Sequence, residues 1–257
     1  MNNVLFEVQE GIATVTINRP KSLNALNSET IGEIYETFDE ISKRDDIKVV
    51  IVTGAGEKAF VAGADIAEMS TLDAAQGRAM AISAHKALAL IESIPQVVIA
   101  AVNGFALGGG CELSMACDIR VASENAKFGQ PEVNLGILPG FGGTQRLARI
   151  VGRGRAKEMI FTTDMITAEE AYRIGLANKV VPQAELMDYC IAMAKKIMTK
   201  GLYGVGLAKS AINFGAETDL ASGCRMEADL FGLCFATEDK KEGMAAFLEK
   251  RPAKFKN

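Results

Sequence analysis

Two short runs rich in β-branched residues constrain the fold of this chain most strongly. One is KVVIVT at residues 48–53 and the other is VVIAAV at residues 97–102. Runs rich in β-branched residues are typical of strands buried on both faces of a parallel sheet. Each run leads into a glycine-rich segment, and a long helical pattern at residues 74–94 separates the two. The sequence therefore predicts an α/β fold in which ligands bind at the carboxyl ends of parallel strands.

The N-terminal segment predicts a hairpin followed by a helix. Apolar and polar residues alternate at Val4–Gln9 and at Ile12–Ile17, on either side of a Glu-Gly pair. Ser28 is the expected N-cap of the helix that follows. The segment at residues 54–65 is expected to be a loop between the first buried strand and a short helix. It opens with G-x-G-x-x-A, a weak dinucleotide signal, and two earlier strands and the lack of a following amphipathic helix argue against that reading.

The C-terminal part of the chain has a different character. From residue 143 onward nearly every segment has helical periodicity, and beyond about residue 200 no strand pattern remains. We therefore expect a core at residues 1–199 and a helical region at residues 200–257. Its apolar faces exceed what a few helices can bury, which favours packing on another subunit, although a lid over the same chain's core is an alternative. The apolar residues concerned are Phe214, Leu220, Met226, Leu230, Phe231 and Phe235.

The segment at residues 103–146 holds the candidate site. Three glycines at residues 108–110 precede an apolar, helical run in which Glu112 lies in the first turn. Glycines at a helix start leave N–H groups at the positive end of the helix dipole, which suits an oxygen that becomes anionic during a reaction. A second carboxylate, Glu132, follows in a predicted loop, and a glycine-rich turn at residues 140–143 closes the segment. The pattern predicts a polarising donor beside one carboxylate and within reach of another.

The two glutamates are the strongest chemical signal in the sequence. Apolar residues flank Glu112 on all helical faces, and burying a carboxylate is costly unless it has partners or a function. The alternative is that each is an ordinary surface charge. His85 is the only histidine, so it cannot join a multi-histidine metal site, and a surface or helix-packing role is favoured over catalysis. General acid–base chemistry then falls to carboxylates, Lys, Tyr or Cys.

Composition excludes several classes of protein. The 257 residues carry a net charge of −4, and no basic footprint indicates a nucleic-acid binder. No run of eighteen apolar residues predicts a membrane span, and no secretory signal is evident. The five cysteines form no CxxC pair, which favours reduced thiols and a cytoplasmic setting.

Four motifs together carry a resemblance to a known family. They are NRPKSLNAL at residues 18–26, KAFVAGADI at 58–66, NGFALGGGCEL at 103–113 and FGQPEVNLGILPGFGGTQRL at 128–147. In this order they resemble the enoyl-CoA hydratase, or crotonase, family, and most of all its short-chain hydratases and 3-hydroxybutyryl-CoA dehydratases. The resemblance runs essentially from end to end of the chain.

The resemblance implies a fold, an assembly and a set of roles. The expected fold is a crotonase-like ββα spiral core with a C-terminal α-helical trimerisation region, assembled as a homohexamer, a dimer of trimers. The backbone N–H groups of Ala64 and Gly109 are expected to form the oxyanion hole, and Glu112 and Glu132 to be the catalytic pair. Coenzyme A, as part of an acyl-CoA substrate, is the only cofactor group implied, and no metal is expected. The implied coenzyme A contacts are Ser22, Ala62, Ala64, Asp65, Ile66, Ala67 and Gly109, with Lys250 as a phosphate contact.

Two other functions stay open at this point. Relatives with the same fold isomerise double bonds or decarboxylate acyl thioesters, but they generally do not keep both carboxylates. A non-enzymatic, RNA-binding member is a different class, and the sequence pI of about 5.3 weighs against it. One departure from the family is Ala67, where many relatives carry lysine, so a phosphate contact at this position is not expected.

Overall fold

The computed structural model describes residues 3–256. Its main sheet has six strands in the order β1-β2-β3-β5-β7-β10, parallel throughout except for the β1–β2 hairpin. The predicted hairpin and the buried parallel strands are therefore confirmed. The strands are β1 (Val4–Gln9), β2 (Ile12–Ile17), β3 (Val49–Gly54), β5 (Val97–Val102), β7 (Ile119–Ser123) and β10 (Lys179–Val181).

Short strands form a second sheet in the order β4-β6-β8-β9. Each of the first three follows a strand of the main sheet and precedes a helix, so the core is a spiral of ββα units, as the resemblance implies. The short strands are β4 (Ala59–Val61), β6 (Phe105–Leu107), β8 (Lys127–Gly129) and β9 (Ile166–Thr167). The helices of the core are α1 (Ser28–Ser42), α2 (Ile66–Met69), α3 (Ala74–Ser93), α4 (Gly109–Ala116), α5 (Gly143–Val151), α6 (Arg153–Thr162), α7 (Ala168–Arg173) and α8 (Leu186–Met198), with 3-10 turns η1 (Pro20–Ser22), η2 (Glu132–Leu135) and η3 (Gln183–Glu185).

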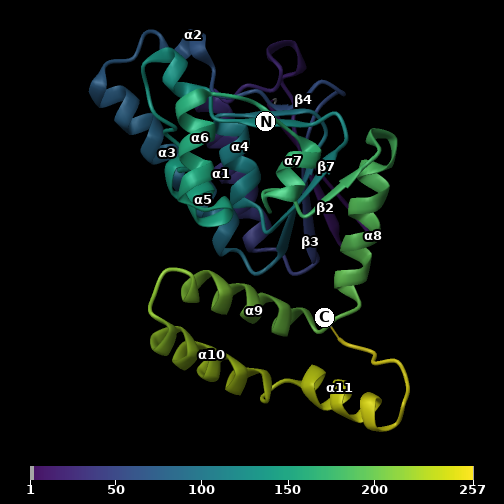
Figure 1. Cartoon of the computed structure of the whole chain (residues 1–257). Coiled ribbons are helices and arrows are strands. Elements are labelled where there is room, and N and C mark those ends of the chain that lie inside the picture. Colours follow the sequence, from purple (N-terminus) through teal and green to yellow (C-terminus); the bar gives the residue numbers. More distant parts are fainter. Residues whose placement is uncertain (1–2, 257) are drawn as a thin grey trace.

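Alternation along the central strands divides the core into two layers. Val50 and Val52 of β3 face the layer that contains α1, α3 and α4, whereas Val49 and Ile51 face α8. Successive side chains of a strand point to opposite faces, so an uninterrupted apolar run fills both layers at once. The buried central strands β3 and β5 position the turns at their carboxyl ends, from which the short strands and α4 emerge (Figure 1).

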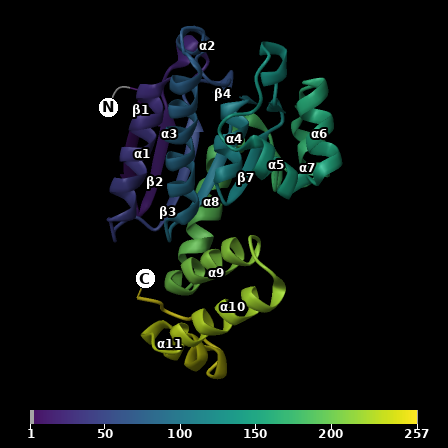
Figure 2. The same cartoon turned by 90° about the vertical axis from the view of Figure 1, so that its left-hand side faces the viewer.

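The C-terminal helices extend away from the core. They are α9 (Leu202–Gly215), α10 (Leu220–Cys234) and α11 (Glu238–Leu248). Lys209 of α9 anchors this region, because its ammonium group is buried and lies 2.9 Å from the Asp118 carboxylate. No residue of α10 is buried, and Leu220 and Phe247 are each 83% exposed. Figures 1 and 2 both place α10 and α11 beneath the core, so these two helices do not cover the core of their own chain, whereas α9 packs against it.

Several local predictions need correction. Asn27, not Ser28, caps α1, because its side chain accepts a hydrogen bond from the Thr30 N–H. The predicted loop at residues 54–65 contains β4, and no helix begins inside its G-x-G-x-x-A motif. The helix α11 had no predicted counterpart. None of the helices in the described part of the chain is long and apolar enough to cross a membrane.

Candidate active site

The turn between β6 and α4 places Glu112 inside the protein. Gly108 has φ 49° and ψ −121°, a conformation that residues with a Cβ atom rarely adopt. Its N–H donates to the Gly129 carbonyl at 2.9 Å, which ties the turn to β8. The helix therefore starts abruptly at Gly109, and Glu112 lies in its first turn, near the end where the dipole favours negative charge.

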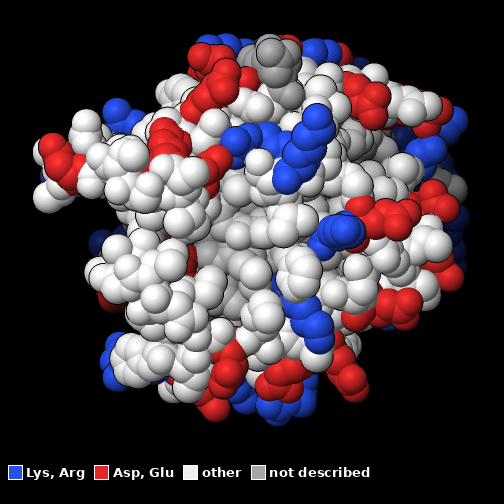
Figure 3. All heavy atoms as spheres, turned by 90° about the horizontal axis from the view of Figure 1, so that it is seen from above, with Lys and Arg blue, Asp and Glu red and all other residues white. Residues whose placement is uncertain are grey.

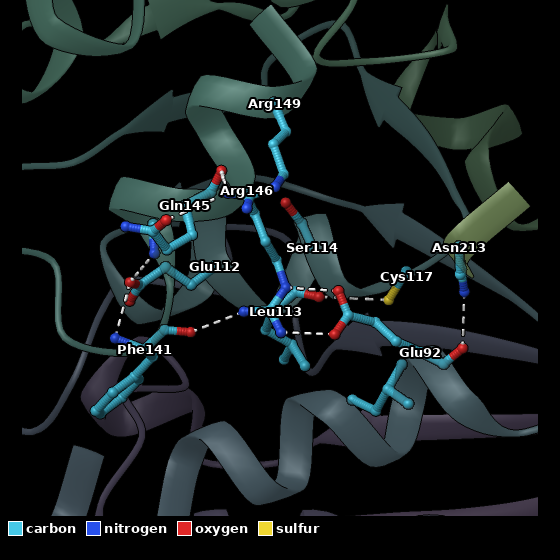
Figure 4. A network of polar contacts seen from close by, with 12 residues as sticks. Glu92, Glu112, Leu113, Ser114, Cys117, Phe141, Gln145, Arg146, Arg149 and Asn213 are labelled. Carbon is cyan, nitrogen blue, oxygen red and sulfur yellow. Dashed lines mark hydrogen bonds and ion pairs between the residues drawn. The ribbon is translucent and has the colours of Figure 1, made fainter. Parts of the chain in front are cut away.

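Glu112 is a buried carboxylate with backbone partners. It is only 1% exposed, and its Oε1 accepts hydrogen bonds from the Phe141 N–H at 2.9 Å and the Gly143 N–H at 2.6 Å (Figure 4). Burial raises its pKa to about 7, and the neighbouring Glu132 charge adds to this, while the two N–H groups oppose it. A carboxyl group of this kind can gain or lose a proton near neutral pH.

Glu132 reaches the same place from a separate segment. It begins the 3-10 turn η2 and is partly buried, and burial raises its pKa to about 7. The fully buried Gln130, its amide oriented by hydrogen bonding, donates to both carboxylate oxygens of Glu132 at 3.1 Å. A Cβ atom at residue 108 would lie 2.6 Å from Glu132 Oε1. The carboxylate therefore lies directly against the turn that precedes α4.

Two backbone N–H groups are placed to act as donors in this region. The Leu26 N–H donates to the Gly63 carbonyl and the Asp65 N–H donates to the Leu26 carbonyl, both at 2.8 Å. Because successive N–H groups of an extended segment alternate in direction, the N–H of Ala64 points away from Leu26. Gly109 is the first residue of α4, so its N–H has no acceptor within the helix.

One cavity of about 480 Å³ brings these groups together, because Ala64, Gly109, Glu112 and Glu132 all line it. Such a volume and a mostly apolar wall are typical of small-molecule sites. Among the described residues, no group of three or more His, Cys, Asp and Glu side chains could hold a metal ion. The apolar side chains of the wall are Met69, Leu72, Ala74, Met80, Ala81, Ile137, Leu138 and Phe141.

Comparison with known proteins decides the family. Residues 7–257 match the family model described as enoyl-CoA hydratase/isomerase. The chain belongs to the enoyl-CoA hydratase/isomerase family. It is 54% identical to the crotonyl-CoA hydratase of Syntrophomonas wolfei, over 98% of this chain and 97% of that protein. It is also 54% identical to the short-chain-enoyl-CoA hydratase of Clostridium acetobutylicum, over 100% and 99% of the two chains.

Solved structures of the family show the same fold. The crystal structure of enoyl-CoA hydratase from Bacillus anthracis has a TM-score of 0.95 and 42% identity, over 99% of both chains. An enoyl-CoA hydratase structure from Geobacillus kaustophilus has a TM-score of 0.97 and 40% identity, over 100% of this chain and 97% of that one. These likenesses confirm the predicted fold class for this hydratase/isomerase-family chain.

The predicted coenzyme A residues fall into two groups in this family member. The side chains of Ser22, Ile66 and Ala67 are exposed. Asp65 is half-buried, caps α2 and pairs with Arg19 at 2.9 Å.

The N–H of Ala62 is engaged as well, since it donates to the Leu23 carbonyl at 3.0 Å. Figure 3, which looks down on the end where α2 lies, shows an uncharged hollow with Lys and Arg side chains along one side. Lys250 is also exposed, but both cartoon views place the C-terminal tail at the opposite end of the molecule from α2 (Figures 1 and 2). The fold therefore does not bring Lys250 to the α2 loop of its own chain.

Sequence reasoning missed the residues that support the two glutamates. Gln130 precedes Glu132 in the predicted loop, and no pattern in the sequence indicates that it is fully buried beside that residue. The Phe141 and Gly143 N–H groups were predicted only as parts of a glycine-rich turn. One sequence signal could have identified them. A glycine-rich turn precedes a helix twice in this chain, at α4 and again at α5.

Proposed function

We propose that this chain catalyses the reversible hydration of short-chain trans-2-enoyl-CoA, such as crotonyl-CoA, to 3-hydroxyacyl-CoA. In the dehydration direction it is a 3-hydroxybutyryl-CoA dehydratase. The observation that carries the proposal is that Glu112 and Glu132, both with raised pKa, line one apolar cavity together with Ala64 and Gly109. The names of the two relatives at 54% identity support the same substrate class.

The proposed mechanism uses each group once. The N–H groups of Ala64 and Gly109 donate to the thioester oxygen and stabilise the negative charge that develops on it. Ionised Glu112 takes a proton from water as the water oxygen bonds to the β-carbon. Protonated Glu132 delivers its proton to the α-carbon. One molecule of water is added across the double bond, and the reverse steps release it.

Substitution of each glutamate tests the proposal. Loss of crotonyl-CoA absorbance is measured with the wild type, Glu112→Gln and Glu132→Gln, and each variant is expected to lose about 10²–10⁴ in kcat. Glu124→Gln is a matched control, because Glu124 is exposed and lies outside the cavity. Undiminished turnover in either catalytic variant would refute the assigned roles. Turnover of a 3-enoyl-CoA without hydration would instead identify an isomerase.

The wider setting follows from the same proposal. We expect a homohexamer, a dimer of trimers, because the exposed apolar faces of α10 and α11 need partners. In such an assembly Lys250 would contact coenzyme A phosphates of a neighbouring subunit. We further propose that the reaction needs no metal or redox cofactor, since water and two carboxyl groups suffice for it. We also propose that the enzyme is cytoplasmic and binds no nucleic acid.

A further inference from the structure

An arginine outside the cavity holds the turn that binds Glu112. Arg146 lies in the first turn of α5, and its guanidinium points back toward α4 and α3 (Figure 4). Its Nη1 donates to the Phe141 carbonyl at 3.0 Å. Its Nε and Nη2 donate to the two carboxylate oxygens of Glu92 at 2.6 and 2.7 Å. Such a bidentate pair fixes the guanidinium in direction as well as in position.

The same turn is therefore held from both sides. The Phe141 N–H donates to Glu112, whereas the Phe141 carbonyl accepts from Arg146. Between these contacts and the Gly143 N–H lies Gly142, which has φ 107°. A Cβ atom at residue 142 would lie 2.2 Å from Arg146 Nη1, so the turn is shaped around the guanidinium. The arginine side chain is 16% exposed and packs inside the protein rather than in solvent.

The rest of the network fixes Glu92 in turn. Asn213 of α9 donates from its side-chain amide to the Glu92 backbone carbonyl at 3.1 Å. This contact connects the end of α3 to the C-terminal helices. The chain of contacts runs from α9 through Glu92 and Arg146 to Phe141 and Glu112 (Figure 4).

We propose that Arg146, clamped by Glu92, is a positioning residue for Glu112. By fixing the turn at residues 141–143, it directs two N–H groups onto Oε1 of Glu112. Oε2 accepts no hydrogen bond from the part of the chain that the structure describes, so it is the oxygen available to the reacting water. Arg146 does not line the cavity and acts only through the turn.

Electrostatics support the same assignment. Burial raises the pKa of Glu112, and the Gly143 and Phe141 N–H groups and the Arg146 charge oppose that rise. Removing the arginine charge and loosening the turn therefore both favour protonated Glu112. The other titratable groups around the site are Glu132 on η2, Cys111 on α4, and Glu92 and His85 on α3.

The test compares Arg146→Met and Glu92→Gln with a matched control on the same helix. Arg149 is also paired bidentately, with Glu217, but it is half exposed and points away from the turn. We expect Arg146→Met to lower kcat for crotonyl-CoA hydration by about 10–10² while KM stays within about two-fold, because a small misplacement of a catalytic group is costly. The kcat of Glu92→Gln is expected to lie between those of Arg146→Met and the wild type. The kcat of Arg149→Met is expected to equal that of the wild type.

Two further readouts separate positioning from stability. In Arg146→Met the acidic flank of the pH–rate profile should move to higher pH, and millimolar guanidinium should restore more of the rate than methylammonium does. Arg146→Lys, which keeps one charge and can donate to Phe141, should recover part of kcat. If folded Arg146→Met has the same kcat and the same pH–rate profile as the wild type, the proposal is overturned.

The inference rests on the proposed function, and the two can fail separately. A wild type that does not hydrate crotonyl-CoA would refute the function. A wild type that does, with Glu112→Gln inactive and both Arg146 variants fully active, would refute only the positioning role. If Arg146→Met does not fold, Arg146→Lys and Glu92→Gln decide the question by the same pH and kcat measurements.

Discussion

Replacing Glu112 by glutamine should stabilise the protein while it removes activity. The two side chains have nearly the same shape, and the glutamine oxygen can accept the same N–H groups of Phe141 and Gly143. The substitution changes only the charge. In the wild type this charge is buried, because Glu112 is only 1% exposed. A buried carboxylate is unfavourable relative to the neutral amide that replaces it.

The magnitude follows from the pKa of Glu112, which burial raises from 4.5 to about 7. The folded protein binds the Glu112 proton more tightly than the unfolded chain does, so this proton stabilises the folded state. The stabilisation is complete below about pH 4.5 and is lost as the pH rises through about 7. At 1.36 kcal/mol for each pKa unit, full ionisation costs ~3 kcal/mol above that pH. The glutamine variant avoids this cost.

Thermal unfolding at two pH values measures the effect. Near pH 5 the variant and the wild type should melt at similar temperatures. At pH 8.5 Glu112→Gln should melt roughly 6–12 °C higher, because ~1 kcal/mol shifts the Tm of a domain of this size by 2–4 °C. Comparing the two proteins at each pH cancels pH effects elsewhere in the chain. Equal melting temperatures at both pH values would show that Glu112 is not a buried ionised group, and would refute the reasoning.

Three other predictions test the same cavity. Gly109→Pro removes one oxyanion donor at a first helical position, and the added Cβ atom would lie 3.0 Å from the Phe141 ring, so kcat should fall by at least about 10²–10³. Gly77 lines the cavity and a Cβ atom there meets nothing within 4 Å; Gly77→Leu should therefore lower kcat/KM for octenoyl-CoA about ten-fold more than for crotonyl-CoA. Hydration needs ionised Glu112 and protonated Glu132, so kcat/KM measured from pH 5 to 9 should fall on both sides of about pH 7, and a flat profile would contradict the assigned roles.

The features that local sequence patterns specify were predictable. The parallel strands β3 and β5 are uninterrupted apolar runs, and no other arrangement buries both of their faces so simply. The burial of Glu112 was predictable because apolar residues surround it on every face of α4. These predictions depend on residues that are neighbours in the chain.

Contacts between distant segments were not predictable from such patterns. The strands β4, β6 and β8 have three residues each, too few to show alternation. The N–H groups that hold Glu112 come from 29 and 31 residues further along the chain, and Arg146 meets Glu92 across 54 residues. Only the folded ββα spiral brings these groups together.

The two carboxyl groups are best understood as a pair that shares one proton. Burial is the main cause that raises the pKa of each to about 7, and the charge of Glu132 contributes to the value for Glu112. Removing the second proton is therefore harder than removing the first, as for other paired carboxylates. The singly protonated pair has two arrangements. Protonated Glu132 with ionised Glu112 is ready for hydration, and the opposite arrangement is ready for dehydration. In the proposed mechanism each turnover converts one arrangement into the other, so the proposed enzyme can work in both directions at one pH.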